Sequence, residues 1–331
     1  MKEYKLIFGR PVRFLGGTRA RCSPNALYRS VWAMTLIGVL LIALAACGGD
    51  DSPASEGDPA GEPSTVQAEA QVTEAPKADD QSAGQPSTSQ LAFEPCEPTL
   101  GENREVLAAF YHATGGPNWT DSENWLTDAP LSDWAGVGAL SQSMEDRLVA
   151  ECVTGLELGN NNLSGEIPAE LVKLTDIAFL YLGGNQLSGK IPAELVKLTG
   201  LVDLNLSENQ LSGEIPAELG SLSELASLDL SGNQLSGEIP AELGNLSELV
   251  VLRLSENRLS GEIPAELGNL SGLTSLRLSE NQLSGEIPAE LGNLTNLEWV
   301  FLTGNVLMGC VPQSLLDAPG DANRLDLPAC N

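Results

Sequence analysis

The residue types that usually carry catalysis are sparse in this chain. It contains a single histidine, His112, among 331 residues. The sequence predicts a helix from about Glu102 to Thr114, and Val106, Leu107 and Phe110 belong to its apolar side. His112 points away from that side, so we interpret it as a solvated residue rather than a general base. The sequence also lacks a Cys/His cluster with metal-ligand spacing, a Gly-rich strand-to-helix loop and a nucleophile elbow. We therefore expect no catalytic residue, no bound metal and no cofactor.

Carboxylates recur every 24 residues in two series that could bind cations. One series is Glu166, Glu214, Glu238, Glu262 and Glu286, with Lys190 in its second place, and the other is Glu170, Glu194, Glu218, Glu242, Glu266 and Glu290. Calcium prefers about six to eight oxygen ligands, and one carboxylate per repeat supplies few of them. A solvated acidic face is therefore favoured over a calcium site. The net charge of −28 argues against a nucleic-acid partner.

A third set of positions also recurs every 24 residues, but the residue type at these positions differs from one copy to the next. These positions carry aromatic residues and arginines, which often anchor recognition surfaces. We predict that a ligand contacts Phe179, Tyr181, Asp203, Asn205, Asp229, Arg253, Arg277, Trp299 and Phe301. An alternative stays open, in which Asp229 and Arg253 only neutralise each other between adjacent strands. In that alternative, Trp299 and Phe301 belong to the C-terminal cap.

All these positions lie in a 24-residue pattern that occurs seven times, L-x-x-L-x-L-x-x-N-x-L-S-G-x-I-P-x-E-L-x-x-L-x-x. The copies begin at Val153, Ile177, Leu201, Leu225, Leu249, Leu273 and Leu297. A fixed period with this leucine spacing predicts a leucine-rich repeat solenoid. Because one coil cannot bury its own apolar face, each repeat depends on its neighbours.

The first half of each repeat predicts a short strand. In the third repeat, alternation of period two sends Leu204 and Leu206 inward and turns Asp203 and Asn205 toward solvent. Stacking seven such strands gives a parallel sheet on the concave face of the solenoid. The fold class is thus an α/β solenoid with a helical N-terminal cap and a disulfide-closed C-terminal cap.

The second half of each repeat predicts how the coil turns. Asn209 occupies a turn where its amide can satisfy backbone groups, and its equivalents should stack as a hydrogen-bonded ladder. Gly213 permits a tight bend. Pro216 limits the following segment to a short extended or 3₁₀ path.

Two motifs carry a family resemblance. The run L-S-G-E-I-P at residues 211–216, repeated in register, resembles the plant-type leucine-rich repeats of receptor-kinase ectodomains, polygalacturonase-inhibiting proteins and many bacterial surface proteins. The segment G-G-P-N-W-T at 115–120, followed by N-W-L at 124–126 and W-A-G-V at 134–137, resembles the N-terminal cap of the bacterial members. The resemblance covers roughly residues 95–331. It implies the fold but names no ligand.

The first ninety residues predict export. Basic residues precede an apolar run from about Val31 to Ala46, which is the layout of a signal peptide. The run ends L-A-A-C at residues 44–47, which resembles the lipobox of bacterial lipoproteins and implies that Cys47 is lipidated. An uncleaved signal anchor is the alternative, although a run of roughly 16 residues is short for a membrane span. The following segment is rich in small, polar and acidic residues and predicts a disordered linker.

Four cysteines remain for disulfides, Cys96, Cys152, Cys310 and Cys330, and they allow three pairings. The solenoid separates Cys152 from Cys310 by about 30 Å at the strand spacing of a sheet. A disulfide requires Cα atoms within about 7 Å. We therefore predict the pairs Cys96–Cys152 and Cys310–Cys330, each closing one end of the stack.

Together these features predict a signal peptide at 1–46, a lipidated cysteine and linker at 47–92, an N-terminal cap at 93–152, repeats at 153–317 and a C-terminal cap at 318–331. We predict a monomeric lipoprotein of the bacterial cell envelope that is membrane-held through its lipid, faces outside the cytoplasm and binds a protein or glycan. One alternative is an inhibitor of an extracellular polysaccharide-degrading or proteolytic enzyme. Another is a purely structural envelope protein, which the near-identity of the repeats favours.

Overall fold

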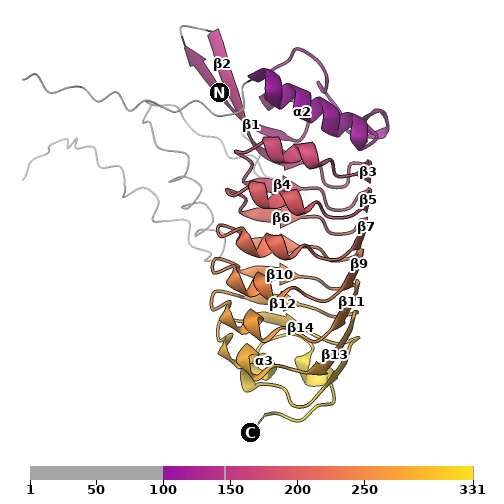
Figure 1. The fold of residues 1–331 in the computed structure, drawn as a ribbon, viewed down its shortest axis with the longest axis vertical. Helices are drawn as coiled ribbons and strands as arrows, with labels where there is room; N and C mark the ends of the chain where they lie inside the picture. The colour runs from indigo at the N-terminus through magenta and orange to yellow at the C-terminus, as the bar shows by residue number, and fades with distance from the viewer. Residues whose placement is uncertain (1–99, 145–146, 331) are drawn as a thin grey trace, which may run out of the picture. The chain divides into compact units, whose positions relative to one another are not determined.

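The structure is a computed structural model that describes residues 100–144 and 147–330. The predicted signal peptide, Cys47, the linker at 47–92 and Cys96 lie outside these residues. Within them, no helix has the length and apolar character needed to cross a membrane. The described residues form a stack of coils with a cap at each end (Figure 1).

The main sheet runs through every coil and contains the first strand of each repeat, preceded by one strand of the N-terminal cap. Its strands are, in order, β1 (Val137–Met144), β2 (Arg147–Glu157), β4 (Phe179–Tyr181), β6 (Asp203–Asn205), β8 (Ser227–Asp229), β10 (Val251–Arg253), β12 (Ser275–Arg277) and β14 (Trp299–Phe301). β1 pairs with β2 in antiparallel fashion, and the later pairs are parallel. Equivalent residues lie side by side, as Leu204 and Leu228 do. The predicted parallel sheet and repeat register are confirmed, and we call the solvent side of this sheet the concave face.

A second parallel sheet, which we did not predict, runs along another side of the coils. It contains β3 (Ser164–Glu166), β5 (Gln186–Gly189), β7 (Gln210–Gly213), β9 (Gln234–Gly237), β11 (Arg258–Gly261), β13 (Gln282–Glu286) and β15 (Val306–Met308). Ser and Gly disfavour isolated strands, so local propensity gives no hint of it. Stacking brings the segments into register, and the Ser212 hydroxyl donates to the Gly189 carbonyl at 3.3 Å. Each strand ends near a glycine with positive φ, such as Gly213 at 84°.

The remaining side of each of the first six coils is a short 3₁₀ helix, as the prolines predicted. These helices are η3 (Ala169–Lys173), η4 (Ala193–Lys197), η5 (Ala217–Ser221), η6 (Ala241–Asn245), η7 (Ala265–Asn269) and η8 (Ala289–Asn293). The residue before each is proline, and Pro216 has extended dihedrals at the start of η5. In η5 the coils approach so closely that a Cβ atom on Gly220 would lie 2.2 Å from the Glu242 carbonyl oxygen.

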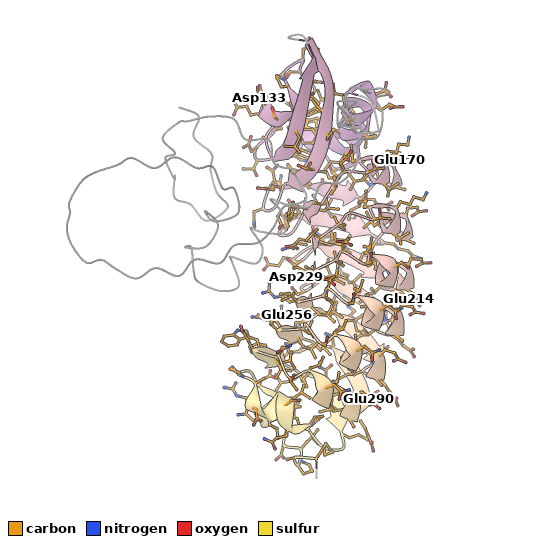
Figure 2. The ribbon with its side chains drawn as sticks, turned by 90° about the vertical axis from the view of Figure 1, so that its left-hand side faces the viewer. Asp133, Glu170, Glu214, Asp229, Glu256 and Glu290 are labelled. Atoms are coloured by element: carbon orange, nitrogen blue, oxygen red, sulfur yellow. A yellow bond between two sulfur atoms is a disulfide. The ribbon has the colours of Figure 1, made fainter. Side chains whose placement is uncertain are left out.

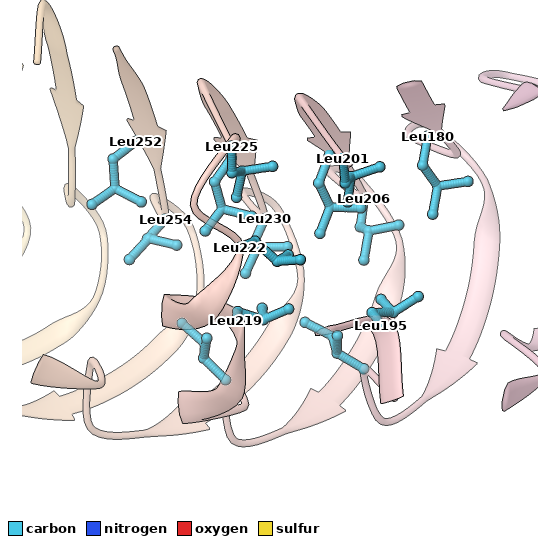
Figure 3. Close-up of a cluster of buried hydrophobic side chains, with 14 of the residues drawn as sticks. Leu180, Leu195, Leu201, Leu206, Leu219, Leu222, Leu225, Leu230, Leu252 and Leu254 are labelled. Carbon is cyan, nitrogen blue, oxygen red and sulfur yellow. The ribbon is translucent and has the colours of Figure 1, made fainter. Parts of the chain in front are cut away.

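The core consists of leucines that point inward from all sides of the coil (Figure 3). Leu204 and Leu206 are fully buried, as alternation predicted. The predicted asparagine ladder is also confirmed. Asn209 accepts a hydrogen bond from the Leu187 amide at 2.9 Å and donates to the carbonyls of Leu182 and Leu206 at 3.0 and 3.2 Å. The ladder thus satisfies backbone groups that turn away from both sheets.

The N-terminal cap covers the first coil with the helix α2 (Leu100–Ala113), which starts and ends within two residues of the prediction. The short helices η1 (Gly116–Asn118) and η2 (Leu131–Asp133) and the β1–β2 hairpin complete it. Trp119, Trp125 and Trp134 are buried against one another beneath these elements. The Glu151 carboxylate is also buried, where it accepts from the Leu131 amide at 2.8 Å and pairs with Arg104 at 3.3 Å.

The C-terminal cap closes the last coil with α3 (Gln313–Asp317) and η9 (Ala322–Arg324). The predicted disulfide between Cys310 and Cys330 is present, with a Cα–Cα distance of 4.9 Å. Its predicted counterpart stays a prediction, because Cys96 lies outside the described residues. The Asp321 carboxylate accepts from the Leu302 amide at 2.6 Å. It therefore replaces the carbonyl that a further coil would offer, since the equivalent Leu278 amide donates to the Phe301 carbonyl.

Candidate functional site

The concave face carries two columns of outward-pointing side chains, one residue of each column from every repeat. The first column is Gly155, Phe179, Asp203, Ser227, Val251, Ser275 and Trp299, and the second is Glu157, Tyr181, Asn205, Asp229, Arg253, Arg277 and Phe301. Adjacent members lie on neighbouring strands, about 4.8 Å apart. These columns contain every ligand-contacting residue that the sequence predicted.

Two of these residues are less accessible than alternation predicted. Asp203 and Asp229 were expected to face solvent, but they are only 8% and 7% exposed. The prediction of their exposure was wrong because strand alternation fixes the direction of a side chain and not what covers it. Tyr181 on β4 bonds to Asp203 on the adjacent strand β6, and Arg253 on β10 bonds to Asp229 on the adjacent strand β8. Each long side chain thus covers the short acid beside it.

The N-terminal part of the face joins two aromatic rings to a buried acid. Phe179 and Tyr181 have ring centroids 6.2 Å apart, and the Tyr181 hydroxyl donates to Asp203 Oδ2 at 3.0 Å. Burial raises the pKa of Asp203 to about 6, although hydrogen bonds from Tyr181 and Ser227 oppose the rise. Burial also raises the pKa of Tyr181, with the negative charges of Asp203 and Glu157 adding to the effect.

The middle of the face is internally neutralised. Arg253 Nη1 lies 3.3 Å from Asp229 Oδ2, and the other Asp229 oxygen accepts from the Ser231 hydroxyl. Asn205 occupies the position of Asp229 in the preceding coil and accepts a hydrogen bond from the Ser207 hydroxyl in the same way. The ion pair that the alternative interpretation required is therefore present. Ligand contact at Asn205, Asp229 and Arg253 stays a prediction.

In the C-terminal part of the face, Arg277 forms no ion pair with a carboxylate of the described residues. The Arg277 guanidinium lies 4.9 Å from the centre of the Phe301 ring, and Phe301 stacks parallel to Trp299 with centroids 6.4 Å apart. Trp299 is 48% exposed. Arg277 Nε and Ser275 Oγ are both buried without a hydrogen-bond partner in the structure, and Ser275 is only 5% exposed. This end can therefore accept an oxygen-bearing group beside an apolar surface.

Residue type alone could not have identified Ser275, which the sequence analysis did not include among the ligand contacts. What distinguishes Ser275 is the pair of residues that flank it on the adjacent strands. Ser275 pairs in register with Val251 on one side and Trp299 on the other, and neither offers its hydroxyl a polar side chain. An alignment of the repeats shows these neighbours, but only the structure shows that the Ser275 hydroxyl is buried without a partner.

The two glutamate series and His112 do not lie on the concave face. Both glutamate series are exposed, and Figure 2 shows Glu170, Glu214 and Glu290 on the side of the coils opposite Asp229 and Glu256. Within residues 100–144 and 147–330, no group of three or more His, Cys, Asp or Glu side chains could hold a metal ion. His112 is exposed on α2, as expected for a solvated residue.

The comparisons with known proteins agree with the repeat architecture. A family model described as a leucine-rich repeat region matches residues 195–307, and a single leucine-rich repeat model matches 152–174 and 177–198. The chain is a leucine-rich repeat protein. A search of curated proteins found no match.

Solved structures extend the likeness to plant receptor-kinase ectodomains. The Arabidopsis receptor kinase HAESA, in complex with the peptide hormone IDA and the co-receptor SERK1, is 33% identical with a TM-score of 0.58 over 65% of this chain and 36% of that chain. PEPR1 in its AtPEP1 complex is 32% identical with a TM-score of 0.57 over 65% and 30%. Pollen receptor kinase 3 is 32% identical with a TM-score of 0.54 over 69% and 100%. This chain thus spans about a third of the first two.

Proposed function

We propose that this protein is a non-catalytic recognition module that binds a protein partner across its concave face. The observation that carries the proposal is the set of unsatisfied polar atoms at the C-terminal part of that face. Arg277 Nε and Ser275 Oγ are buried without acceptors or donors, although buried polar groups are normally paired. Because the Arg277 side chain is half-buried and not fully covered, a partner that supplies an acceptor to its guanidinium gains a charge-assisted hydrogen bond.

The neighbouring rings suit the same role. Trp299 exposes 48% of its surface beside Phe301, and exposed aromatic residues next to arginine are frequent anchors of protein interfaces. The coils stack through continuous sheets and a shared leucine core, so we expect the face to bind with little backbone movement. Rigidity favours affinity because few groups must be ordered on binding.

Similar solved structures support a protein partner. HAESA is bound to a peptide hormone and a co-receptor, and PEPR1 is in complex with AtPEP1. Because this chain spans only 36% and 30% of those chains, their partners do not identify the partner here. We extend to this chain only the binding of a polypeptide.

We further propose that the module is a lipoprotein of a bacterial cell envelope, exposed outside the cytoplasm. The support is the basic and apolar leader and the L-A-A-C run that ends at Cys47. These residues lie outside the described part of the chain. An acidic linker between Cys47 and the cap would let the repeats reach a partner away from the membrane.

Site-specific crosslinking tests the proposed function directly. The full chain would carry a photoreactive phenylalanine in place of Trp299, which is exposed on the concave face, or at Glu218 on η5 as the far-side control. The proposal predicts that position 299 crosslinks one defined envelope or secreted protein, whereas position 218 does not. Equal crosslinking from both positions, or none from position 299, would contradict a concave-face partner.

A further inference from the structure

Asp203 is a buried carboxyl group with hydrogen-bond donors but no positive charge next to it. It is 8% exposed and accepts a hydrogen bond from Tyr181 at 3.0 Å. Arg253 is paired with Asp229 on β8, the strand next to Asp203, and not with Asp203 itself. A buried ionised carboxylate without a cation is costly, and a cation brought next to it would offset that cost.

The surroundings of Asp203 favour a particular kind of cation. Phe179 is its register neighbour on β4, and Tyr181 lies beside Phe179 on the same face. The faces of aromatic rings attract ammonium and guanidinium groups. Glu157, on β2 next to Tyr181, is exposed and adds a second negative charge to this part of the face. Two rings and two carboxylates thus lie on three adjacent strands, β2, β4 and β6, in the N-terminal half of the face.

We infer that Phe179, Tyr181, Asp203 and Glu157 form a subsite for a cationic side chain, a lysine or arginine, presented by the protein partner. The inference rests on the proposed function, because it places this side chain on the partner that the concave face binds. The complementary group of the same partner meets Arg277 on β12, three strands further along the sheet. The partner segment therefore carries its positive charge toward the N-terminal cap and an oxygen-bearing group about 14 Å away toward the C-terminal cap.

Occupation of this subsite should depend on pH. The groups that face Asp203 are Tyr181 and Ser227, which donate hydrogen bonds, Asp229, which repels its charge, and Arg253, which attracts it. Burial and this balance raise the pKa of Asp203 to about 6. Below that pH the carboxyl must lose a proton before it can pair with a cation, so binding weakens. If the bound carboxyl is fully ionised, affinity should fall about tenfold between pH 7 and pH 5.

The test uses the full chain labelled with ¹³C in its aspartate carboxyl groups. Nα-acetyl-lysine methylamide serves as the cationic probe, and its Nε-acetylated form, which is neutral, serves as the matched control ligand. Asp203→Asn identifies the Asp203 resonance. The inference predicts that the cationic probe lowers the titration midpoint of Asp203 from about 6 and binds about tenfold more tightly at pH 7 than at pH 5.

Two variants separate a specific site from general attraction to an acidic protein. Asp203→Asn should abolish the pH dependence and weaken binding, whereas Glu218→Gln, which removes one charge from η5, should leave both unchanged. An equal response to the neutral probe would overturn the inference, as would a midpoint that does not move. A midpoint that calcium chloride lowers equally at the same ionic strength would overturn it in favour of a metal site. These outcomes do not depend on crosslinking from position 299, so the subsite and the proposed function can fail separately.

Discussion

Replacing Asn233 with alanine tests the view that the asparagine ladder holds the coils together. Asn233 is buried between the third and fourth coils. Its side-chain oxygen accepts from the Leu211 amide at 3.0 Å, and its amide donates to the carbonyls of Leu206 and Leu230 at 3.0 and 3.1 Å. The variant removes these three bonds together with a fourth, to the Ser231 carbonyl, which keeps the Glu208 amide as a donor.

The cost is not equal for the three backbone groups. Leu206 and Leu230 keep one donor each after the substitution, from Asn209 and Asn257. The Leu211 amide loses its acceptor, and a buried unpaired group costs about 1–3 kcal/mol. Weakening two carbonyls adds about 1–2 kcal/mol. We therefore expect Asn233→Ala to lower the free energy of unfolding by about 2–5 kcal/mol.

Urea unfolding of the full chain, followed by circular dichroism, measures this loss. Two controls bracket it. Gln234→Ala changes the exposed next residue and should stay within about 0.5 kcal/mol of the parent. Asn305→Ala removes the last, half-buried member of the ladder, where water can replace the lost bonds, and should cost less than Asn233→Ala. A loss below about 1 kcal/mol at Asn233 would refute the reasoning.

Three further predictions concern charge and anchoring. Because the pKa of Asp203 is raised from 3.8 to about 6, its stabilising contribution is nearly complete at pH 3 and is lost as the pH rises through 6. Between pH 3 and pH 7, denaturant titrations should show wild type losing about 3 kcal/mol relative to Asp203→Asn, and parallel pH profiles would disprove the shift. Sodium chloride should raise the melting temperature by screening the exposed glutamate series. Calcium should add nothing beyond its ionic strength, and a calcium-specific rise would point to a metal site. Cys47→Ser should abolish labelling with a radioactive fatty acid, and retained labelling would exclude lipidation at Cys47.

The repeat architecture could be predicted because its determinants are local and occur seven times. Each coil repeats the same inward leucines, the same turn asparagine and the same proline, so every copy supports the same interpretation of the others. The second sheet escaped prediction for a physical reason. Its strands contain serine and glycine, and only contact with neighbouring coils makes them extended.

The residues of the candidate site could be predicted from the sequence, but their burial and their bonding partners could not. Period-two alternation correctly assigned Tyr181, Arg253 and Arg277 to one face of the main sheet. It could not predict that Tyr181 and Arg253 would cover Asp203 and Asp229, because that depends on side-chain length across neighbouring strands. Nor could it predict which polar atoms remain without partners. That information appears only when burial and geometry are known together.

The affinity of the crosslinked partner for concave-face variants tests the central claim most directly. Tyr181→Ala, Arg253→Ala and Arg277→Ala should each weaken binding by about fivefold to about a thousandfold, the usual range for the truncation of an interface anchor. Glu218→Ala and Glu242→Ala, which change exposed residues on η5 and η6, should bind as the parent does. Unchanged circular dichroism and melting temperatures would show that each variant is folded. If all five variants bind with equal affinity, the partner does not use the concave face and the account is wrong.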